Sequence, residues 1–224
     1  MRYELGVAVR ATLADTLSAV NRPLADWKFR RAVRNARGPI LVSAGAGNRK
    51  LEGWLNTDVG WRSPLYLDLT KPWPVPNASV SRVYADNVIE HFGLKVGRLV
   101  LKHAFDALKP DGRIRLVTPD VEQTARAYLN DPDLTAQHLE RHRRVGYDVY
   151  HPVDLLRVTF SECGHHLGFC YDWEALSTEL RGAGFVELQS FTPGDSNDPV
   201  LRSLEARMEP TEAATSLVIE GKKP

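Results

Sequence analysis

The sequence contains little cysteine and almost no excess of charge of either sign. Its two cysteines, Cys163 and Cys170, cannot form a disulfide framework, and they do not make the CxxC pair of a zinc site. Lysine and arginine total 29 against 28 for aspartate and glutamate, so no overall field attracts nucleic acid or anionic lipid. These absences argue against a disulfide-rich scaffold and against a protein that binds polyanions through its net charge.

Long apolar runs are missing as well. No stretch approaches the ~18 residues of a membrane span, and the first residues lack the basic start and continuous apolar segment of a signal peptide. We therefore expect no membrane span and a cytoplasmic location. Three residues close to the cysteines, Glu162, His165 and His166, could ligate a metal ion, but the sequence argues against a metal site at these residues. The oligomeric state leaves no trace in the sequence.

Helical spacing dominates the first part of the chain. Apolar positions within residues 5–37 predict one or two helices, and five basic residues between Lys28 and Arg37 give this segment a basic face. We interpret that face as a solvated surface, and a surface for an anionic partner stays open as the alternative. Gly38 and Pro39 end the helix, so residues 1–38 are expected to form an N-terminal helical extension.

Beyond this extension, short apolar runs alternate with helical segments, which is typical of a mostly parallel sheet. Residues 93–109 and 172–184 show the strongest helical spacing, and the polar residues 121–150 are expected to be helical but less tightly packed. The pattern predicts one α/β domain over residues 39–224, with helices on both faces of the sheet. The expected strands are PILVSA, WLNTDV, PLYLDL, SRVYADNV, RIRLVTP, FVELQSF and TSLVIEGK.

The first strand runs into a small loop, Gly45-Ala46-Gly47, of the kind that lets a ligand approach the backbone. A dinucleotide fingerprint needs a third glycine and an acid about 20 residues further on. Here Lys50 occupies the third position, and Asp58 follows Gly47 after only eleven residues. The spacing leaves no room for a long pyrophosphate-binding helix, yet a carboxylate at a strand end still suits a ribose diol. A nicotinamide-dependent oxidoreductase is therefore disfavoured.

Three stretches taken together carry a resemblance: LVSAGAGNRKLEGWLNTDV, LYLDLTKPWPVPNASVSRVYADNVIEHF and VLKHAFDALKPDGRIRLVTPD. They resemble the core of class I S-adenosylmethionine-dependent methyltransferases, with a Rossmann-like, mostly parallel seven-stranded sheet. The Gly-Trp pair that leads into Asn-x-Asp resembles the branch that acts on sugars and other small molecules. The resemblance implies S-adenosylmethionine as cofactor and a sugar or small-molecule hydroxyl as acceptor.

The resemblance also implies roles for individual residues. Gly45 and Gly47, with Ala44 and Ala46, match the loop that faces the methionine moiety, although relatives often carry a polar residue or cysteine at the position of Ala46. Asp58 would then hold the ribose. The other implied cofactor contacts are Asp68 and Leu69 beside the adenine, and Asp86 and Asn87 within the Ala85–Val88 segment near the sulfonium.

A hydroxyl acceptor needs its proton removed, and histidine is the usual general base near neutral pH. The candidates are His165 and His166, before the late helix, and His91 in the run NVIEHF, with the pair narrowly favoured. Neighbouring carboxylates are available at Glu90 and Glu162. Each histidine could instead be a satisfied structural residue.

Nucleic acid is not expected as the acceptor. Enzymes that methylate the adenine amine resemble one another in an Asp/Asn-Pro-Pro-aromatic run, where this chain reads Ala85-Asp86-Asn87-Val88. Methylation of cytosine C5 requires a nucleophilic cysteine in a Pro-Cys context, which neither cysteine has. A non-catalytic binding or assembly module with the same fold stays open as an alternative.

Residues 121–168 are predicted to shape the acceptor side and to act partly as a lid. Their composition suits a hydroxyl-rich or anionic ligand, but an ordinary solvated helix would have a similar one. The residues behind this prediction are Arg141, His142, Arg143, Arg144, Tyr147 and Tyr150.

Overall fold

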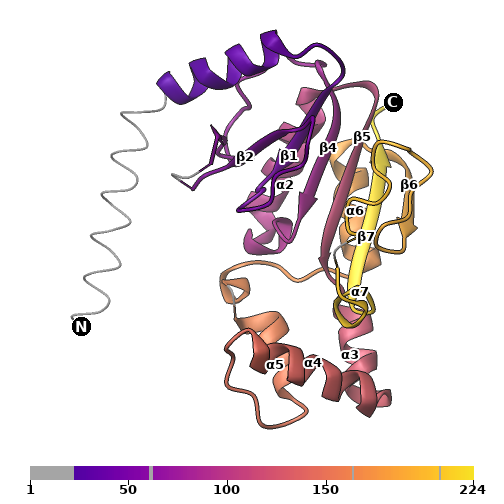
Figure 1. The fold of residues 1–224 in the computed structure, drawn as a ribbon. Coiled ribbons are helices and arrows are strands. Elements are labelled where there is room, and N and C mark those ends of the chain that lie inside the picture. The colour runs from indigo at the N-terminus through magenta and orange to yellow at the C-terminus, as the bar shows by residue number, and fades with distance from the viewer. Residues whose placement is uncertain (1–22, 61–62, 163, 207) are drawn as a thin grey trace.

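A single seven-stranded sheet organises the chain (Figure 1). The computed structural model describes residues 23–60, 63–162, 164–206 and 208–224. The strand order is β3-β2-β1-β4-β5-β7-β6, and β7 runs antiparallel to both of its neighbours while the remaining pairs are parallel. The predicted Rossmann-like, mostly parallel seven-stranded fold is therefore confirmed.

Each predicted strand is present, with small shifts at its ends. β5 differs most, because its bounds include the predicted turn at Pro110-Asp111-Gly112. The pairing of β4 with β5 is irregular there, and Asp111 has a positive φ of 61°. The strands are β1 (Ile40–Ala44), β2 (Leu55–Asp58), β3 (Leu65–Tyr66), β4 (Val80–Asp86), β5 (Leu108–Pro119), β6 (Val186–Phe191) and β7 (Ser216–Lys222).

The helices fall into two groups, one against the sheet and one beyond its carboxyl edge (Figure 1). α6 begins and ends as predicted, since the Asp172 side chain accepts a hydrogen bond from Ala175 N and Gly184 closes it with a φ of +105°. The helices are α2 (Leu94–Ala107), α3 (Val121–Asn130), α4 (Pro132–Arg144), α5 (Asp154–Ser161), α6 (Trp173–Ala183) and α7 (Pro210–Ala213), with the short 3-10 helices η1 (Ile89–His91) and η2 (His165–Leu167).

One face of the sheet packs against α2 and α6 and forms the main hydrophobic core. Alternation along the strands produces this core, since Val83 and Ala85 of β4 belong to it while Tyr84 points to the opposite face. The N-terminal helix over residues 23–35 contributes Phe29, which is fully buried in the same core. The rest of the predicted N-terminal extension, residues 1–22, lies outside the described residues.

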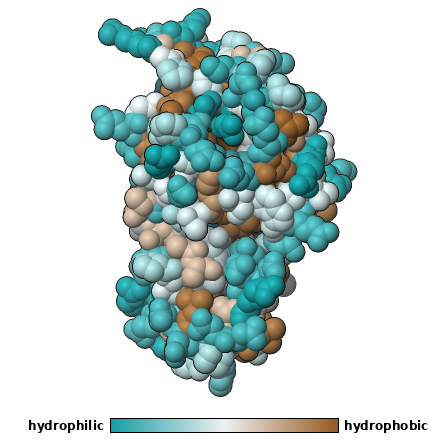
Figure 2. Space-filling model, turned by 90° about the vertical axis from the view of Figure 1, so that its right-hand side faces the viewer, coloured by the Kyte–Doolittle hydropathy of each residue, from teal (hydrophilic) through white to brown (hydrophobic). Residues whose placement is uncertain are grey.

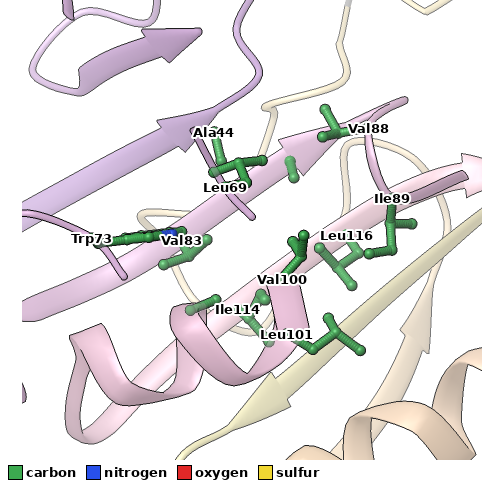
Figure 3. Close-up of a pocket in the computed structure, with 12 residues that line it drawn as sticks. Ala44, Leu69, Trp73, Val83, Val88, Ile89, Val100, Leu101, Ile114 and Leu116 are labelled. Atoms are coloured by element: carbon green, nitrogen blue, oxygen red, sulfur yellow. The ribbon is translucent and has the colours of Figure 1, made fainter. Parts of the chain in front are cut away.

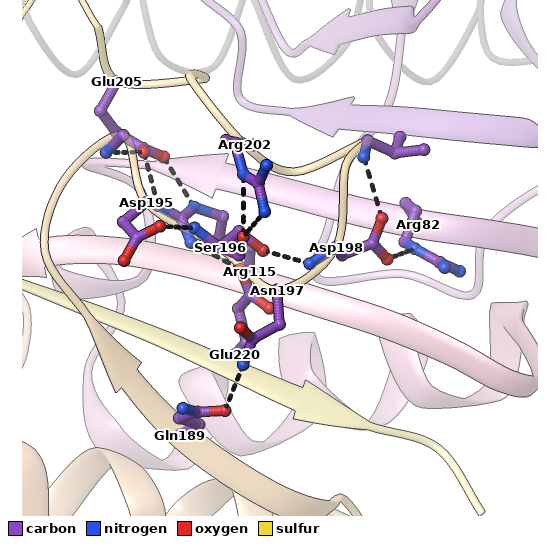
Figure 4. Close-up of polar contacts among 12 residues, drawn as sticks. Arg82, Arg115, Gln189, Asp195, Ser196, Asn197, Asp198, Arg202, Glu205 and Glu220 are labelled. Atoms are coloured by element: carbon purple, nitrogen blue, oxygen red, sulfur yellow. Dashed lines mark hydrogen bonds and ion pairs between the residues drawn. The ribbon is translucent and has the colours of Figure 1, made fainter.

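The opposite face is covered mainly by turns, so the helices that were expected on both faces pack on only one face of the sheet among the described residues. Leu201 and Leu204, from the segment between β6 and β7, pack on it together with Leu51 and Trp54 from the β1–β2 connection. Beneath this cover lies a polar network in which Arg115 pairs with Glu205 and Glu220, and Arg82 with Asp198 (Figure 4). No helix separates β1 from β2 in the described residues, as the short spacing from Gly47 to Asp58 predicted.

The helices α3, α4 and α5 pack on one another as a lobe beyond the carboxyl ends of β4 and β5 (Figure 1). Figure 2 shows this lobe as the lower part of the molecule, where hydrophobic side chains appear in small groups on a largely hydrophilic surface. Two ion pairs tie α4 to α7, the short helix that precedes β7: Arg141 with Glu212 at 2.5 Å, and Arg144 with Glu209, the residue before α7, at 2.8 Å.

Among the described helices, none combines the length and the apolar character needed to cross a lipid bilayer.

Candidate active site at the carboxyl edge of the sheet

The loop after β1 adopts a conformation that requires glycine. Gly45 has a φ of +65° and Gly47 a φ of +54°. A Cβ on Gly45 would lie 2.5 Å from Cγ2 of Val88, so Gly45 lets the loop pack against the residue that follows β4. A Cβ on Gly47 would meet nothing within 4 Å, and Gly47 is exposed. Space beside this loop is therefore available on the side of Gly47.

Asp58 lies at the end of β2 and is bonded to the glycine loop. Its Oδ2 accepts a hydrogen bond from Gly47 N at 2.9 Å, and its Oδ1 accepts one from Gly60 N at 2.8 Å. Because each carboxylate oxygen has two lone pairs, both oxygens can still accept a further hydrogen bond. Asp58 thus holds the loop in place and can still receive a ribose hydroxyl.

Arg49, which the sequence analysis did not single out, lies close to this loop in sequence and bonds to side chains of β4. Its Nη1 donates to Oδ2 of Asp86 at 2.7 Å and to the hydroxyl oxygen of Tyr84 at 2.9 Å. The Tyr84 hydroxyl in turn donates to Asp86 Oδ2 at 3.0 Å. Burial and the nearby Asp86 charge raise the pKa of Tyr84, so its hydroxyl stays protonated. Asp86 is therefore held by Arg49 and Tyr84, and its position at the end of β4 is rigid.

Asp68 and Leu69, the residues expected beside the adenine, have structural roles in a turn and in the core, respectively. Oδ1 of Asp68 accepts from both the backbone N and the Oγ1 of Thr70, at 2.9 and 2.6 Å, so Asp68 opens the turn after β3. The Leu69 side chain is buried in the main core, as is Ala44 at the end of β1. A contact of Leu69 or Ala44 with a cofactor would therefore involve their backbone atoms.

A cavity of about 250 Å³ lies between the carboxyl edge of the sheet and the helical lobe. Asn87, at the end of β4, contributes to its wall and has a positive φ of 54°, which asparagine tolerates. Three of the residues predicted from the lid segment line it: Arg141, His142 and Tyr147. Arg143, Arg144 and Tyr150 do not, and Tyr150 is exposed. His138, next to His142 on α4, was not anticipated.

Two of the predicted catalytic histidines come together at this cavity. The rings of His91 and His165 lie 4.8 Å apart between centroids, and both line the cavity. Glu90 is buried beside them, with Oε1 4.0 Å from His165 Nε2. Burial raises the pKa of the Glu90 carboxyl to about 8, and partial burial together with the neighbouring His165 lowers the pKa of His91.

His166 is separated from this group. It is exposed and does not line the cavity, although it is the next residue after His165 in η2. The Glu162 backbone carbonyl accepts a hydrogen bond from His165 N at 3.0 Å, but its carboxylate pairs with Arg157 at 2.6 Å and does not join the histidine group. Cys163 lies outside the described residues. The metal-ligand types therefore group as Glu90, His91 and His165, not as the sequence neighbours Glu162, His165 and His166.

A second void lies inside the core between the sheet and α2, among residues such as Leu69, Val83 and Leu116 (Figure 3). Its volume is about 20 Å³, and every side chain around it is apolar. That volume is near the size of a single water molecule, so this void cannot hold a cofactor.

No protein-family model matches the chain, and no curated protein sequence matches it either. Solved structures with a similar fold include a SAM-dependent methyltransferase from Archaeoglobus fulgidus, which is 14% identical with a TM-score of 0.49. That match covers 90% of this chain and 94% of the other. A possible histamine N-methyltransferase from Thermotoga maritima is 14% identical with a TM-score of 0.47, and 96% of each chain is covered.

The CurJ carbon methyltransferase is 15% identical with a TM-score of 0.48, and the match covers 84% of this chain. This chain spans about half, 49%, of the CurJ methyltransferase chain. At such low identity these likenesses concern the fold, so the reaction and the acceptor have to follow from this chain's own residues.

Proposed function

We propose that this chain is an S-adenosylmethionine-dependent methyltransferase that methylates a hydroxyl group of a sugar or another small molecule. The observation that carries the proposal is the bond between Asp58 Oδ2 and Gly47 N, which joins the end of β2 to the open glycine of the β1 loop. A nucleoside bound there would meet a carboxylate for its ribose diol and a glycine backbone for close approach.

The acceptor side is supported by the cavity between the sheet and α4. Two polar atoms of its lining, Nδ1 of His142 and Nε of Arg141, are buried without a hydrogen-bond partner among the described residues. Such groups cost free energy unless a ligand or water satisfies them, and a polyhydroxylated ligand offers both donors and acceptors. The cavity wall also includes His91 and His165, where a proton could leave the acceptor.

The reaction needs little from the protein beyond position and proton removal. The acceptor oxygen attacks the methyl carbon, the S–CH₃ bond breaks, and its electron pair stays on sulfur, which loses its positive charge. Well-oriented reactants gain effective molarities on the order of 10⁵–10⁸ M. The cavity begins at Asn87, which follows β4, the strand that pairs with β1, so an acceptor bound there would lie at the same edge of the sheet as the β1 loop.

The alternatives are less well supported. A nicotinamide cofactor would need the helix that follows a GxGxxG loop, and none lies between β1 and β2 in the described part of the chain. A non-catalytic relative would have no need of the Glu90, His91 and His165 group beside the cavity.

The cofactor assignment is tested by Asp58→Ala. Loss of hydrogen bonds to a charged group should weaken S-adenosylmethionine binding by about 1.5–3 kcal/mol, or roughly 10–150-fold in affinity. Calorimetry with S-adenosylmethionine, S-adenosylhomocysteine and NAD measures this. Asp133→Ala, an exposed aspartate in the first turn of α4, is the matched control and should bind as the wild type does. Unchanged affinity in folded Asp58→Ala protein would remove Asp58 from the site.

Proton removal is tested separately with His91→Ala and His165→Ala. Replacement of the histidine that acts as the base should lower turnover by about 10²–10⁴-fold while cofactor affinity stays nearly the same, because proton removal matters only in the transition state. Release of S-adenosylhomocysteine with a panel of sugars and hydroxylated small molecules is the readout. Turnover within about threefold of wild type in both variants would favour an acceptor that needs no base, such as an amine or thiol.

A further inference from the structure

Glu90, His91 and His165 bring an oxygen and two nitrogen ligand atoms within 4.8 Å of one another. The three residues come from η1 and η2, which are joined where Phe169 N donates a hydrogen bond to the Glu90 carbonyl oxygen at 3.2 Å. Gly168 makes this contact possible, because a Cβ there would lie 1.7 Å from the same carbonyl oxygen. The close packing of two segments distant in sequence is what assembles the group.

Glu90 is the unusual member of this group. Its side chain is almost fully buried, at 1% exposure, and neither carboxylate oxygen makes a well-formed hydrogen bond among the described residues, although the Thr118 hydroxyl and nearby backbone partly offset the effect of burial on its pKa. Its nearest basic neighbour is His165, whose Nε2 is 4.0 Å from Oε1. A buried carboxyl that is this poorly hydrogen-bonded is costly, and a bound cation would compensate for that cost.

His165 is oriented as a ligand. Its Nδ1 lies 2.6 Å from the carbonyl oxygen of Thr159, and since a carbonyl can only accept, Nδ1 carries the proton. Nε2 therefore keeps its lone pair, and Nε2 is the nitrogen that approaches Glu90. Metal-binding histidines commonly donate their second nitrogen to a carbonyl or carboxylate in this way, which fixes the tautomer and the ring orientation.

We propose that Glu90, His91 and His165 bind one divalent transition-metal ion of the zinc class. Two imidazoles with one carboxylate suit zinc, cobalt or nickel better than magnesium or calcium, which prefer oxygen ligands. Three protein ligands leave one coordination position open, as in catalytic zinc sites. His91 and His165 line the 250 Å³ cavity, so the open position faces the space assigned to the acceptor.

The role of the ion rests on the proposed function, whereas its binding does not. A metal-bound hydroxyl ionises more readily, so the acceptor proton can leave to water. The acceptor oxygen then forms the O–CH₃ bond as the S–CH₃ bond breaks and the electron pair stays on sulfur. In this case His91 and His165 would act as ligands rather than as proton acceptors, and each alanine variant would still lose turnover.

A second histidine pair in the same cavity offers a control. His138 and His142 have ring centroids 6.0 Å apart, but Nε2 of His138 is engaged with Thr215 Oγ1 at 3.2 Å. The carboxylate that lines the cavity near them, Glu212, is paired with Arg141. This pair therefore lacks the carboxylate ligand that Glu90 supplies to the proposed site.

The proposal is tested on the untagged full chain after treatment with a chelator. Calorimetric titration with zinc chloride should show one ion per chain in the wild type. Glu90→Gln, His91→Ala and His165→Ala should each weaken binding by at least about 100-fold, because outer-shell partners alone are worth about 10–100-fold. His166→Ala and His142→Ala are matched controls that should retain wild-type affinity. Cobalt chloride should give visible absorption bands that disappear in His165→Ala.

Three outcomes would overturn the site: no stoichiometric zinc binding, wild-type affinity in the ligand variants, or tighter binding of magnesium than of zinc. Glu90→Gln is isosteric and His91 is exposed, so these two variants keep the test valid if His165→Ala does not fold. S-adenosylhomocysteine binding to the same samples separates the two proposals. Cofactor binding without zinc binding overturns the metal site alone, whereas zinc binding without cofactor binding overturns the proposed function alone.

Discussion

At the scale of single residues, Arg115 is the clearest case of a buried charge whose contribution to stability depends on its ion-pair partners. It is fully buried, with Nη2 2.6 Å from Glu205 and Nη1 2.5 Å from Glu220 (Figure 4). Arg115→Met should lower the free energy of unfolding by about 3–5 kcal/mol at pH 7, since two buried carboxylates lose their counter-ion. Urea denaturation measures the change, and Arg98→Ala, which breaks an exposed pair with Glu179, should change little.

The same triad predicts how that loss depends on pH. Burial raises the pKa of Glu205, but Arg115 outweighs it and holds the pKa below its ordinary value. A depressed carboxyl pKa contributes stability above the unfolded-state value near 4.3, and this stability is lost as the pH falls through the folded value. Without Arg115, burial raises the pKa of the Glu205 carboxyl. This carboxyl therefore takes up a proton as the pH falls, and the variant then no longer carries an unpaired buried charge at Glu205. The difference between wild type and Arg115→Met should therefore shrink from pH 7 to pH 4.5; a constant difference would contradict this account.

At the scale of elements, α4 and α5 line the cavity, and together with α3 they contact one another more than they contact the sheet. We predict that residues 121–168 act partly as a lid, with α4 held to α7 through Arg141 and Glu212. Hydrogen exchange in this segment should slow when S-adenosylhomocysteine binds. Identical exchange with and without the cofactor product would indicate an ordinary packed lobe, and α2 serves as the internal reference because it lies in the main core.

At the scale of the whole molecule, cofactor binding should be visible as thermal stability. A ligand that binds only the folded state adds about 2.7 kcal/mol at 100 times its Kd. For a chain of 224 residues, each kcal/mol raises Tm by about 2–4 °C, so we expect a rise of roughly 5–11 °C with S-adenosylmethionine or S-adenosylhomocysteine. NAD at the same concentration should leave Tm unchanged, and an equal rise with NAD would contradict the methyltransferase assignment.

Local sequence patterns were sufficient for most of the fold. Apolar runs and helical periodicity located all seven strands, α2 and α6, because burial on one or both faces leaves a regular spacing of apolar residues. The β1 loop and Asp58 were found in the same way, since a strand end, a glycine loop and an acid are adjacent along the chain. The position of Asp68 in a turn and the burial of Leu69 needed the structure, as packing decides which groups face a ligand.

The sequence by itself determined the sheet, the glycine loop with its acid, and the types of side chain available for catalysis. The tertiary structure decided which of them meet. His165 and His166 are neighbours in sequence but only His165 reaches Glu90 and His91, because η2 packs on η1 at Gly168 and turns the next residue toward solvent. Likewise Arg49 reaches Asp86 and Arg115 reaches Glu205 across 37 and 90 residues. Contacts between residues so far apart in sequence depend on how the helices and strands pack, so they cannot be predicted from the local spacing of residues.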